Sequence, residues 1–131
     1  MAAQVATHEK FALESNMREW RQKRPCVYIM ASKRDGVLYI GVTSGLNDRI
    51  SIHSQDLIDG FTKKYSVHRL VYYEFFETMP EAILRESRLK KWKRAWKVRL
   101  IHSFNPEWLD LFDELSGSVL DGPADLERYR D

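Results

Sequence analysis

The stretch CVYIMASKRDGVLYIGVT, residues 26–43, decides the fold of this chain. Two runs rich in β-branched and aromatic residues, 26–30 and 37–43, lie on either side of Asp35-Gly36, and Asp-Gly between such runs is a strong hairpin signal. A type I′ turn is expected there, with positive φ at both central residues. The hairpin would bring the phenols of Tyr28 and Tyr39 near one another on a small sheet.

The rest of the chain predicts one more strand and a series of helices. The segment HRLVYYEFF, residues 68–76, is rich in β-branched and aromatic residues, as a third strand would be. Thr78 and Glu81 fit a capping box at a helix start, and Asn105 is placed to cap a later helix. Helices are expected at 46–58, 79–93, 95–103 and 105–115, with a basic loop at 61–66. This order predicts an α+β domain, in which a small three-stranded antiparallel β-sheet is flanked by helices.

By composition the chain divides into three parts. With 131 residues, 44% of them hydrophobic, it has enough apolar material for one domain with a modest core. That domain is expected at 23–115, after an N-terminal extension at 1–22 whose apolar residues have helical spacing. Residues 116–131 are acidic and contain Ser, Gly and Pro, which predicts a flexible tail. Because the extension could dock on its own domain or on a second copy, a monomer or a weak homodimer is expected.

Several classes of protein are excluded by simple features. No apolar run approaches the roughly 18–20 residues that a membrane-spanning helix needs. The first ten residues lack the charged and then apolar layout of a secretory signal. Cys26 is the only cysteine, which rules out an intrachain disulfide and a cysteine-rich zinc site, and its place in a strand suggests a small core residue. Residence in the cytoplasm is therefore expected.

The net charge of +2 hides a strong asymmetry. Residues 1–106 carry 19 Lys and Arg against 11 Asp and Glu, whereas residues 107–131 carry two against eight. Eight of the basic residues lie within 85–99, where Trp92 and Trp96 interleave with them. Such a run is either a solvated helix face or a surface for nucleic acid. The tryptophans favour nucleic acid, although both could also pack into the core.

Glu86 lies where an apolar residue would be expected. Ile83, Leu89 and Trp92 define the apolar face of the predicted helix, and Glu86 is three residues from each of the first two. A carboxylate on a core-facing stripe is costly unless it is paired or binds a metal. Two interpretations stay open: a structural salt bridge with a nearby arginine, or a ligand for a hard cation. Mg²⁺ often takes only one or two protein carboxylates and draws its other ligands from water and phosphate.

Arg49 and His53 share one helix face at a spacing of four residues, close after the tyrosine-bearing strands. Pairs at this spacing are common on helix surfaces, so alone they would mean little. Arginine binds phosphate oxygens through two N–H groups, and histidine accepts or relays a proton near neutral pH. A phenol becomes a usable base when cationic neighbours lower its pKa, as Arg49 and a metal at Glu86 would. Together with Tyr28 and Tyr39, these residues suggest phosphate chemistry.

In this combination the residues closely resemble the GIY-YIG (URI) endonuclease superfamily, in particular its small stand-alone bacterial members. The second half of the family's name stands at residues 39–41 as YIG, ending in the motif glycine Gly41. The first half is CVY at residues 26–28, which keeps the tyrosine but not the leading glycine. The resemblance covers about residues 25–112. The matching residues downstream of the hairpin are Arg49, His53, Glu86 and Asn105.

This resemblance implies a Mg²⁺- or Mn²⁺-dependent endonuclease that hydrolyses phosphodiester bonds in DNA. Branched, damaged and single-stranded forms of DNA are the candidate substrates. Glu86 would hold the single metal, and Arg49 would stabilise the pentavalent phosphate. Tyr28 and Tyr39 would position and deprotonate the attacking water, either one as the base, with His53 assisting. Asn105 would join the catalytic residues. The basic residues expected to contact nucleic acid are Lys63, Lys64, Lys90, Lys91, Lys93 and Arg94.

A second hypothesis has the same fold and a different function. The chain could be a nucleic-acid-binding module that keeps the fold without cleavage. The complete set of site residues favours the endonuclease, because a binding module has no need for a core-facing glutamate at Glu86.

Overall fold

The computed structural model describes residues 23–54, 60–113 and 115–120. Its main sheet has three antiparallel strands in the order β2-β1-β3, which confirms the predicted α+β fold. The strands are β1 (Cys26–Ala31), β2 (Leu38–Thr43) and β3 (Arg69–Phe75), and a small hairpin adds β4 (Phe112–Asp113) and β5 (Ser118–Val119). The helices are α2 (Leu46–Ser54), α3 (Phe61–Lys64), α4 (Met79–Lys91) and α5 (Arg94–Phe104). No helix among the described residues is long and apolar enough to cross a membrane.

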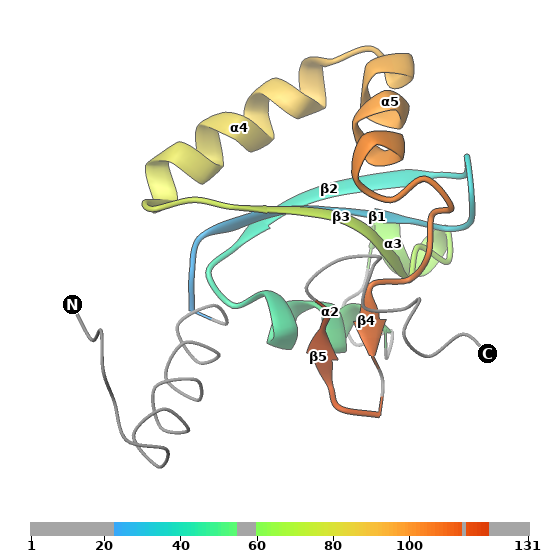
Figure 1. The fold of residues 1–131 in the computed structure, drawn as a ribbon, viewed down its shortest axis with the longest axis horizontal. Helices are drawn as coiled ribbons and strands as arrows, with labels where there is room; N and C mark the ends of the chain where they lie inside the picture. Colours follow the sequence, from blue (N-terminus) through green and yellow to red (C-terminus); the bar gives the residue numbers. More distant parts are fainter. Residues whose placement is uncertain (1–22, 55–59, 114, 121–131) are drawn as a thin grey trace, which may run out of the picture.

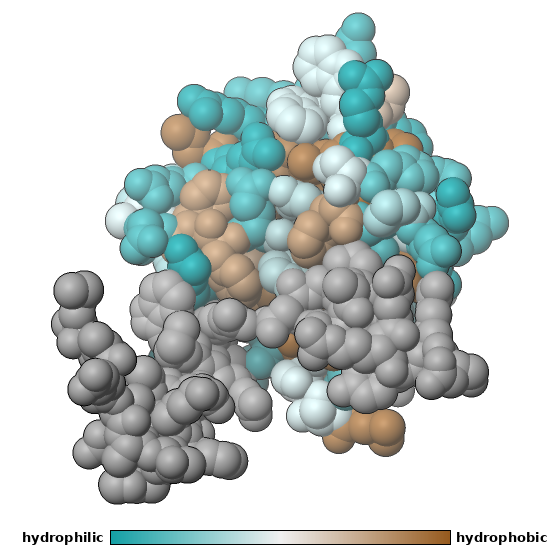
Figure 2. Space-filling model, viewed as in Figure 1, coloured by the Kyte–Doolittle hydropathy of each residue, from teal (hydrophilic) through white to brown (hydrophobic). Residues whose placement is uncertain are grey.

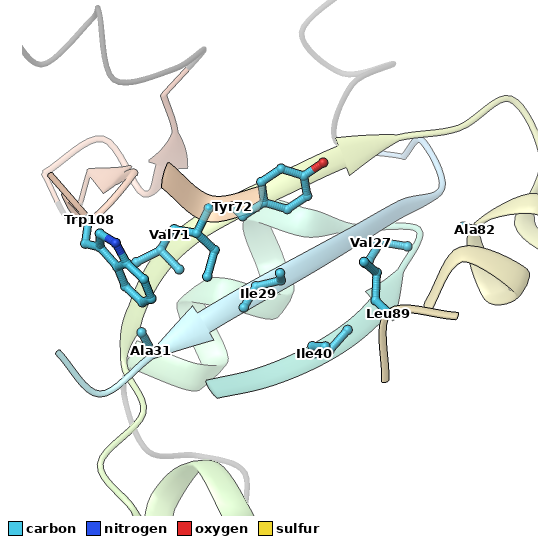
Figure 3. Close-up of a cluster of buried hydrophobic side chains, with 10 residues drawn as sticks. Val27, Ile29, Ala31, Ile40, Val71, Tyr72, Ala82, Leu89 and Trp108 are labelled. Carbon is cyan, nitrogen blue, oxygen red and sulfur yellow. The ribbon is translucent and has the colours of Figure 1, made fainter. Parts of the chain in front are cut away.

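The sheet is covered on both faces. Figure 1 shows α4 and α5 on one side of it, and α2 with the β4–β5 hairpin on the other. Side chains alternate along a strand, so the central strand β1 contributes to two cores. Val27, Ile29 and Ala31 face the α4–α5 side, where Figure 3 shows them among the buried residues of that core. Tyr28 and fully buried Cys26 belong to the core on the α2 side, which confirms the core position predicted for the cysteine.

The β1–β2 hairpin is confirmed, but its turn differs from the predicted type I′ turn. Only Asp35 has a positive φ, of 57°, and Gly36 does not. The turn closes one residue earlier, because the Gly36 N–H donates to the Lys33 carbonyl at 3.0 Å. Six residues separate the two strands, and the Ser32 N–H donates to the Val37 carbonyl at 3.0 Å across the base of this longer loop.

The start of α4 follows its sequence signal. The side-chain oxygen of Thr78 accepts a hydrogen bond from the Glu81 N–H at 3.4 Å, and proline occupies the first turn. This satisfies one of the backbone donors that a helix start leaves without a partner inside the helix. The predicted N-cap is therefore confirmed, and the orientation of the helix start is set only three residues after β3 ends.

The helix predicted at 105–115 is wrong. Asn105 ends α5, since its N–H donates to the Ile101 carbonyl at 2.7 Å, and Trp108 departs from helical backbone with a φ of 56°. The Asn105 amide also accepts from the Leu109 N–H at 3.0 Å and donates to the Leu109 carbonyl at 2.8 Å. Asparagine side chains compete with helical hydrogen bonds in this way, so the segment closes into a loop.

This loop covers the outer edge of β3. Leu70 is bonded there twice, by its N–H to the Asp110 carboxylate at 3.1 Å and by its carbonyl to the Leu111 N–H at 2.9 Å. The pairing of β4 with β5 continues the ordered structure to Leu120, beyond the predicted domain end at 115. The extension predicted at 1–22, and most of the predicted tail, lie outside the described residues.

Candidate active site

The centre of the site is a hydrogen bond between β1 and α2. The Tyr28 hydroxyl lies 3.1 Å from Nε2 of His53, and both side chains are almost completely buried. Tyr39, near the start of β2, completes a triangle of rings. Its centroid is 6.2 Å from that of Tyr28 and 5.5 Å from that of His53, and the remaining side is 5.9 Å. The structure thus brings together both phenols and the imidazole, as the sequence predicts.

Gly41 makes room for this arrangement. It pairs with Tyr28 across the β1–β2 ladder, so a side chain at Gly41 would point to the same face as the tyrosine. A Cβ atom there would lie 2.4 Å from both Cζ and the hydroxyl oxygen of Tyr28. The phenol therefore lies across β2, an edge strand of the sheet, and its hydroxyl meets His53 of α2.

Arg49 supplies a positive charge from α2, one helical turn before His53. Its side chain is exposed, and among the described residues it forms no hydrogen bond or ion pair. Its charge nevertheless lowers the pKa of both Tyr28 and His53, so it lies within electrostatic reach of both. A guanidinium in this state can bind phosphate oxygens without giving up a protein partner.

Glu86 enters from α4, on the other face of the sheet. Its side chain is 16% exposed, as a core-facing position predicts, and it pairs with Lys90 at 3.4 Å rather than with an arginine. Its charge raises the pKa of the Tyr28 phenol, which links it to the tyrosine cluster. The predicted apolar face is partly wrong, because Ile83 is 47% exposed and Ala82 takes the buried place beside Leu89. The face of α4 that packs inward therefore runs through Ala82 and Leu89, with Glu86 half-buried between them.

Burial dominates the protonation of the Tyr28 phenol. It raises the pKa of Tyr28, and the Tyr39 phenol adds to this, so the lowering by Arg49 is outweighed. Arg49 by itself therefore does not bring the pKa of Tyr28 below its ordinary value, and the lowering by Arg49 together with a metal stays a prediction. Burial and Arg49 both lower the pKa of His53, which keeps its imidazole neutral near pH 7. With its own proton on Nδ1, that imidazole can accept the Tyr28 proton at Nε2.

The donors for a metal are few. Within the residues that the structure describes, no three His, Cys, Asp or Glu side chains come together as a metal-binding group. Among the residues that the structure describes, Glu86 is the one carboxylate whose charge acts on the Tyr28 phenol, and its ion pair there is with the exposed Lys90. A single carboxylate fits Mg²⁺ or Mn²⁺ when water and substrate phosphate complete the shell. The residues present therefore fit a substrate-assisted metal site at Glu86.

Asn105 is not brought to the tyrosine cluster by any contact among the described residues. It is fully buried, and its amide donates to the carbonyl of Val71 at 3.2 Å as well as binding the backbone of Leu109. Val71 is the extra residue of a β-bulge opposite the Ile29–Met30 pair, where the β3 ladder is interrupted. These bonds give Asn105 a structural role, and its catalytic role stays a prediction.

The basic residues predicted to contact nucleic acid fall into two groups. Lys63 and Lys64 lie at the end of α3, whereas the others lie around the α4–α5 junction. Figure 2 shows hydrophilic and near-neutral side chains gathered over the upper part of this view, where Figure 1 places α4 and α5. Arg94 donates to the carbonyls of Asp35 and Gly36 at 2.7 and 2.6 Å, so it anchors α5 to the β1–β2 turn.

The two tryptophans of the basic run line a shallow pocket between α4 and α5. Their rings meet edge to face with centroids 6.1 Å apart, and Trp96 is 48% exposed. The Lys93 ammonium lies 5.9 Å from the centre of the Trp96 ring. Trp92 also packs against the buried core, whereas Trp96 borders solvent, and contact of either ring with nucleic acid stays a prediction.

A second polar cluster, absent from the sequence-based predictions, lies beside Glu86. The Tyr72 hydroxyl donates to the carboxylate of Glu74, which also holds the guanidinium of Arg85 on α4. A signal for it exists in the chain, because Tyr72 and Glu74 alternate on one face of an otherwise apolar strand. Finding the partner requires the helix packing, which places Arg85 above that face.

Comparison with known proteins agrees with this geometry. Residues 24–99, more than half of the chain, match the GIY-YIG catalytic domain, and the chain therefore belongs to the GIY-YIG family. A GIY-YIG catalytic domain suggests phosphodiesterase chemistry, with a nucleic acid as the substrate.

Its bacterial relatives are small proteins. A UPF0213 protein of Clostridium perfringens (strain 13 / Type A) is 42% identical over 77 residues, which cover 59% of this chain and 82% of the relative. A UPF0213 protein of Staphylococcus aureus (strain Mu3) is 39% identical over 75 residues, which cover 57% of this chain and 90% of the relative. No solved structure matches the chain.

Proposed function

We propose that this protein is a metal-dependent endonuclease that hydrolyses phosphodiester bonds in DNA. One observation supports this above all others: the Tyr28–His53 hydrogen bond of 3.1 Å lies within electrostatic reach of both Arg49 and Glu86. A proton relay, a cation and a carboxylate therefore act on one phenol. Those are the groups that an in-line displacement at phosphorus requires.

Each residue has a distinct task in this mechanism. Arg49, exposed and without a protein partner among the described residues, binds the phosphate and stabilises the charge that develops on its oxygens. Tyr39 orients the attacking water, and Tyr28 accepts a proton from that water while its own hydroxyl proton passes to Nε2 of the neutral His53 imidazole. Glu86 would hold the divalent cation, which when bound polarises the phosphate and lowers the pKa of bound water. With the cation present, the burial that raises the pKa of Tyr28 is opposed by a second positive charge.

The test is nicking of supercoiled plasmid DNA with Mg²⁺ or Mn²⁺. Glu86→Gln and Arg49→Ala should each lower the cleavage rate at least about 100-fold, since each removes a group that stabilises transition-state charge. Glu81→Gln, on the exposed start of the same helix, and Arg34→Ala, in an exposed turn, are the matched controls and should cleave at the wild-type rate. Equal nicking by the wild type and by both site variants would mean a contaminating nuclease and would end the proposal.

A binding module without cleavage is the alternative outcome. It would show salt-dependent binding to DNA that Glu86→Gln leaves unchanged, with no cleavage of duplex, nicked, flapped, single-stranded or RNA substrates. The same panel of substrates decides between DNA and RNA, because a preference for RNA would overturn the DNA part of the proposal alone.

A further inference from the structure

We propose that Glu74 is a positioning residue for Glu86 and acts through Arg85, the residue next to Glu86 on α4. The inference rests on the proposed function, because it concerns how the carboxylate of the candidate metal site is directed. It assigns a role to the polar cluster of Tyr72, Glu74 and Arg85, which lies on the α4–α5 side of the sheet.

Arg85 is held by groups from two directions. Its Nη2 donates to Oε2 of Glu74 at 3.3 Å, and its Nε lies 3.1 Å from Oε1. The Nε–H is not directed at that oxygen, so the second contact is an ion pair without a well-aligned hydrogen bond. The guanidinium carbon also lies 5.1 Å from the centre of the Trp92 ring, which supports it from the end of α4.

Glu74 is itself fixed in place. It stands on β3, paired with Val27 of the central strand, and its carboxylate accepts a hydrogen bond from the Tyr72 hydroxyl two residues earlier. The side chains of Glu74 and Arg85 are 28% and 25% exposed, so water competes with this pair less than with an exposed one. Helix α4 is thereby tied to a rigid point of the sheet.

The direction of Glu86 follows from that tie. Successive residues on an α-helix are about 100° apart around its axis, so holding Arg85 toward β3 sets where Glu86 points. Its side chain then faces inward, and its charge reaches the Tyr28 phenol. The ion pair with Lys90 provides little orientation, because that lysine is 55% exposed and water competes with an exposed pair of this kind.

Removing the charge of Glu74 should allow α4 to change its orientation on the sheet. Arg85 would keep a half-buried charge without a carboxylate partner, and such a group is more stable when it turns toward water. Since α4 is a continuous helix, that movement rotates or loosens the turn that carries Glu86. The effect reaches the site without any contact between Glu74 and substrate.

Glu74→Gln is the test, with Glu77→Gln as the matched control. Glu77 also precedes α4 and also forms an ion pair, with Arg24 at 3.1 Å, but it is largely exposed and holds no residue of the helix. The first measurement needs neither metal nor activity: the three-bond coupling between the backbone nitrogen and Cγ of Glu86, measured by NMR, reports whether its side chain keeps one rotamer. The second is the Mn²⁺ concentration that half-broadens the Glu86 amide signal.

The expected result is specific to Glu74. In Glu74→Gln the coupling should move from the value of a single rotamer toward a rotamer average, and about tenfold more Mn²⁺ should be needed, as when a residue behind a metal ligand is removed. In Glu77→Gln both values should match the wild type. Arg85→Lys, which keeps the charge but loses the two-point contact, should change both values in the same direction and serves if Glu74→Gln does not fold.

Two outcomes would overturn the inference. One is a Glu74→Gln protein that is less stable but has wild-type coupling and Mn²⁺ response, which would make the cluster structural only. The other is an equal change in Glu77→Gln, which would assign the effect to the β3–α4 connection. Absence of cleavage by the wild type would instead end the proposed function, and it would leave the coupling measurement standing.

Discussion

Alanine at Gly41 should destabilise the fold and disrupt the candidate site through a single contact. The added Cβ would lie 2.4 Å from Cζ and from the hydroxyl oxygen of Tyr28, about 1 Å closer than an ordinary contact. Gly41 has no positive φ, so the cost is steric and not a strain of the backbone. Overpacking of this kind lowers the free energy of unfolding by about 1–3 kcal/mol. Since Tyr28 must move, its hydrogen bond to His53 should also be lost.

Denaturant unfolding measures the first effect and plasmid nicking the second. Gly36→Ala is the control for crowding away from the site, because a Cβ there would lie 2.3 Å from Ser32 Oγ and 3.0 Å from the Lys33 backbone nitrogen, in the turn between β1 and β2. It should also lower stability, but it should leave cleavage by the folded protein unchanged. In a Tyr28→Leu background the cost of Gly41→Ala should shrink, because the obstructing atoms are gone.

The reasoning fails if Gly41→Ala unfolds at the wild-type denaturant midpoint, or if its cost stays the same in the Tyr28→Leu background. Either result would mean that the glycine is needed for something other than the passage of the phenol across β2.

Three further predictions concern protonation, the β3 edge and the basic surface. Burial and Arg49 lower the pKa of His53 in the folded protein. The unfolded chain therefore takes up the proton first, and the free energy of unfolding should fall as the pH drops below about 6.5. Unfolding titrations at several pH values should show a flatter dependence for His53→Gln. Asn105→Ala should lower the free energy of unfolding by about 3 kcal/mol, because its buried hydrogen bonds are lost. The variant should still cleave DNA at a temperature where it stays folded, and loss of cleavage there would indicate a catalytic role for Asn105. For binding to DNA, Lys91→Ala should reduce the slope of log affinity against log salt concentration by about 0.9. Arg94→Ala should leave that slope unchanged, because the Arg94 guanidinium is bound to the β1–β2 turn. Equal slopes in the two variants would refute this difference between the two residues.

Much of the fold could be predicted because its signals are local. Alternating apolar residues on either side of Asp35-Gly36 predict the hairpin, and Thr78 three residues before Glu81 predicts the start of α4. The turn type and the last helix were not predictable in the same way. Asn105 has the sequence of a helix start, but its amide is more stable when it satisfies the bulge at Val71 and the backbone of Leu109.

The same division applies to the site. The sequence by itself determined which groups are present, because phenols, guanidinium, imidazole and carboxylate have fixed chemistry wherever they lie. Only the tertiary structure decided the protonation of the phenol and the burial of the carboxylate. Burial raises the pKa of Tyr28 although a cation is near, and the packing of α4 against β1 and β2 leaves the Glu86 side chain only 16% exposed. Desolvation and helix rotation depend on residues distant in the chain, and for that reason no local pattern contains them.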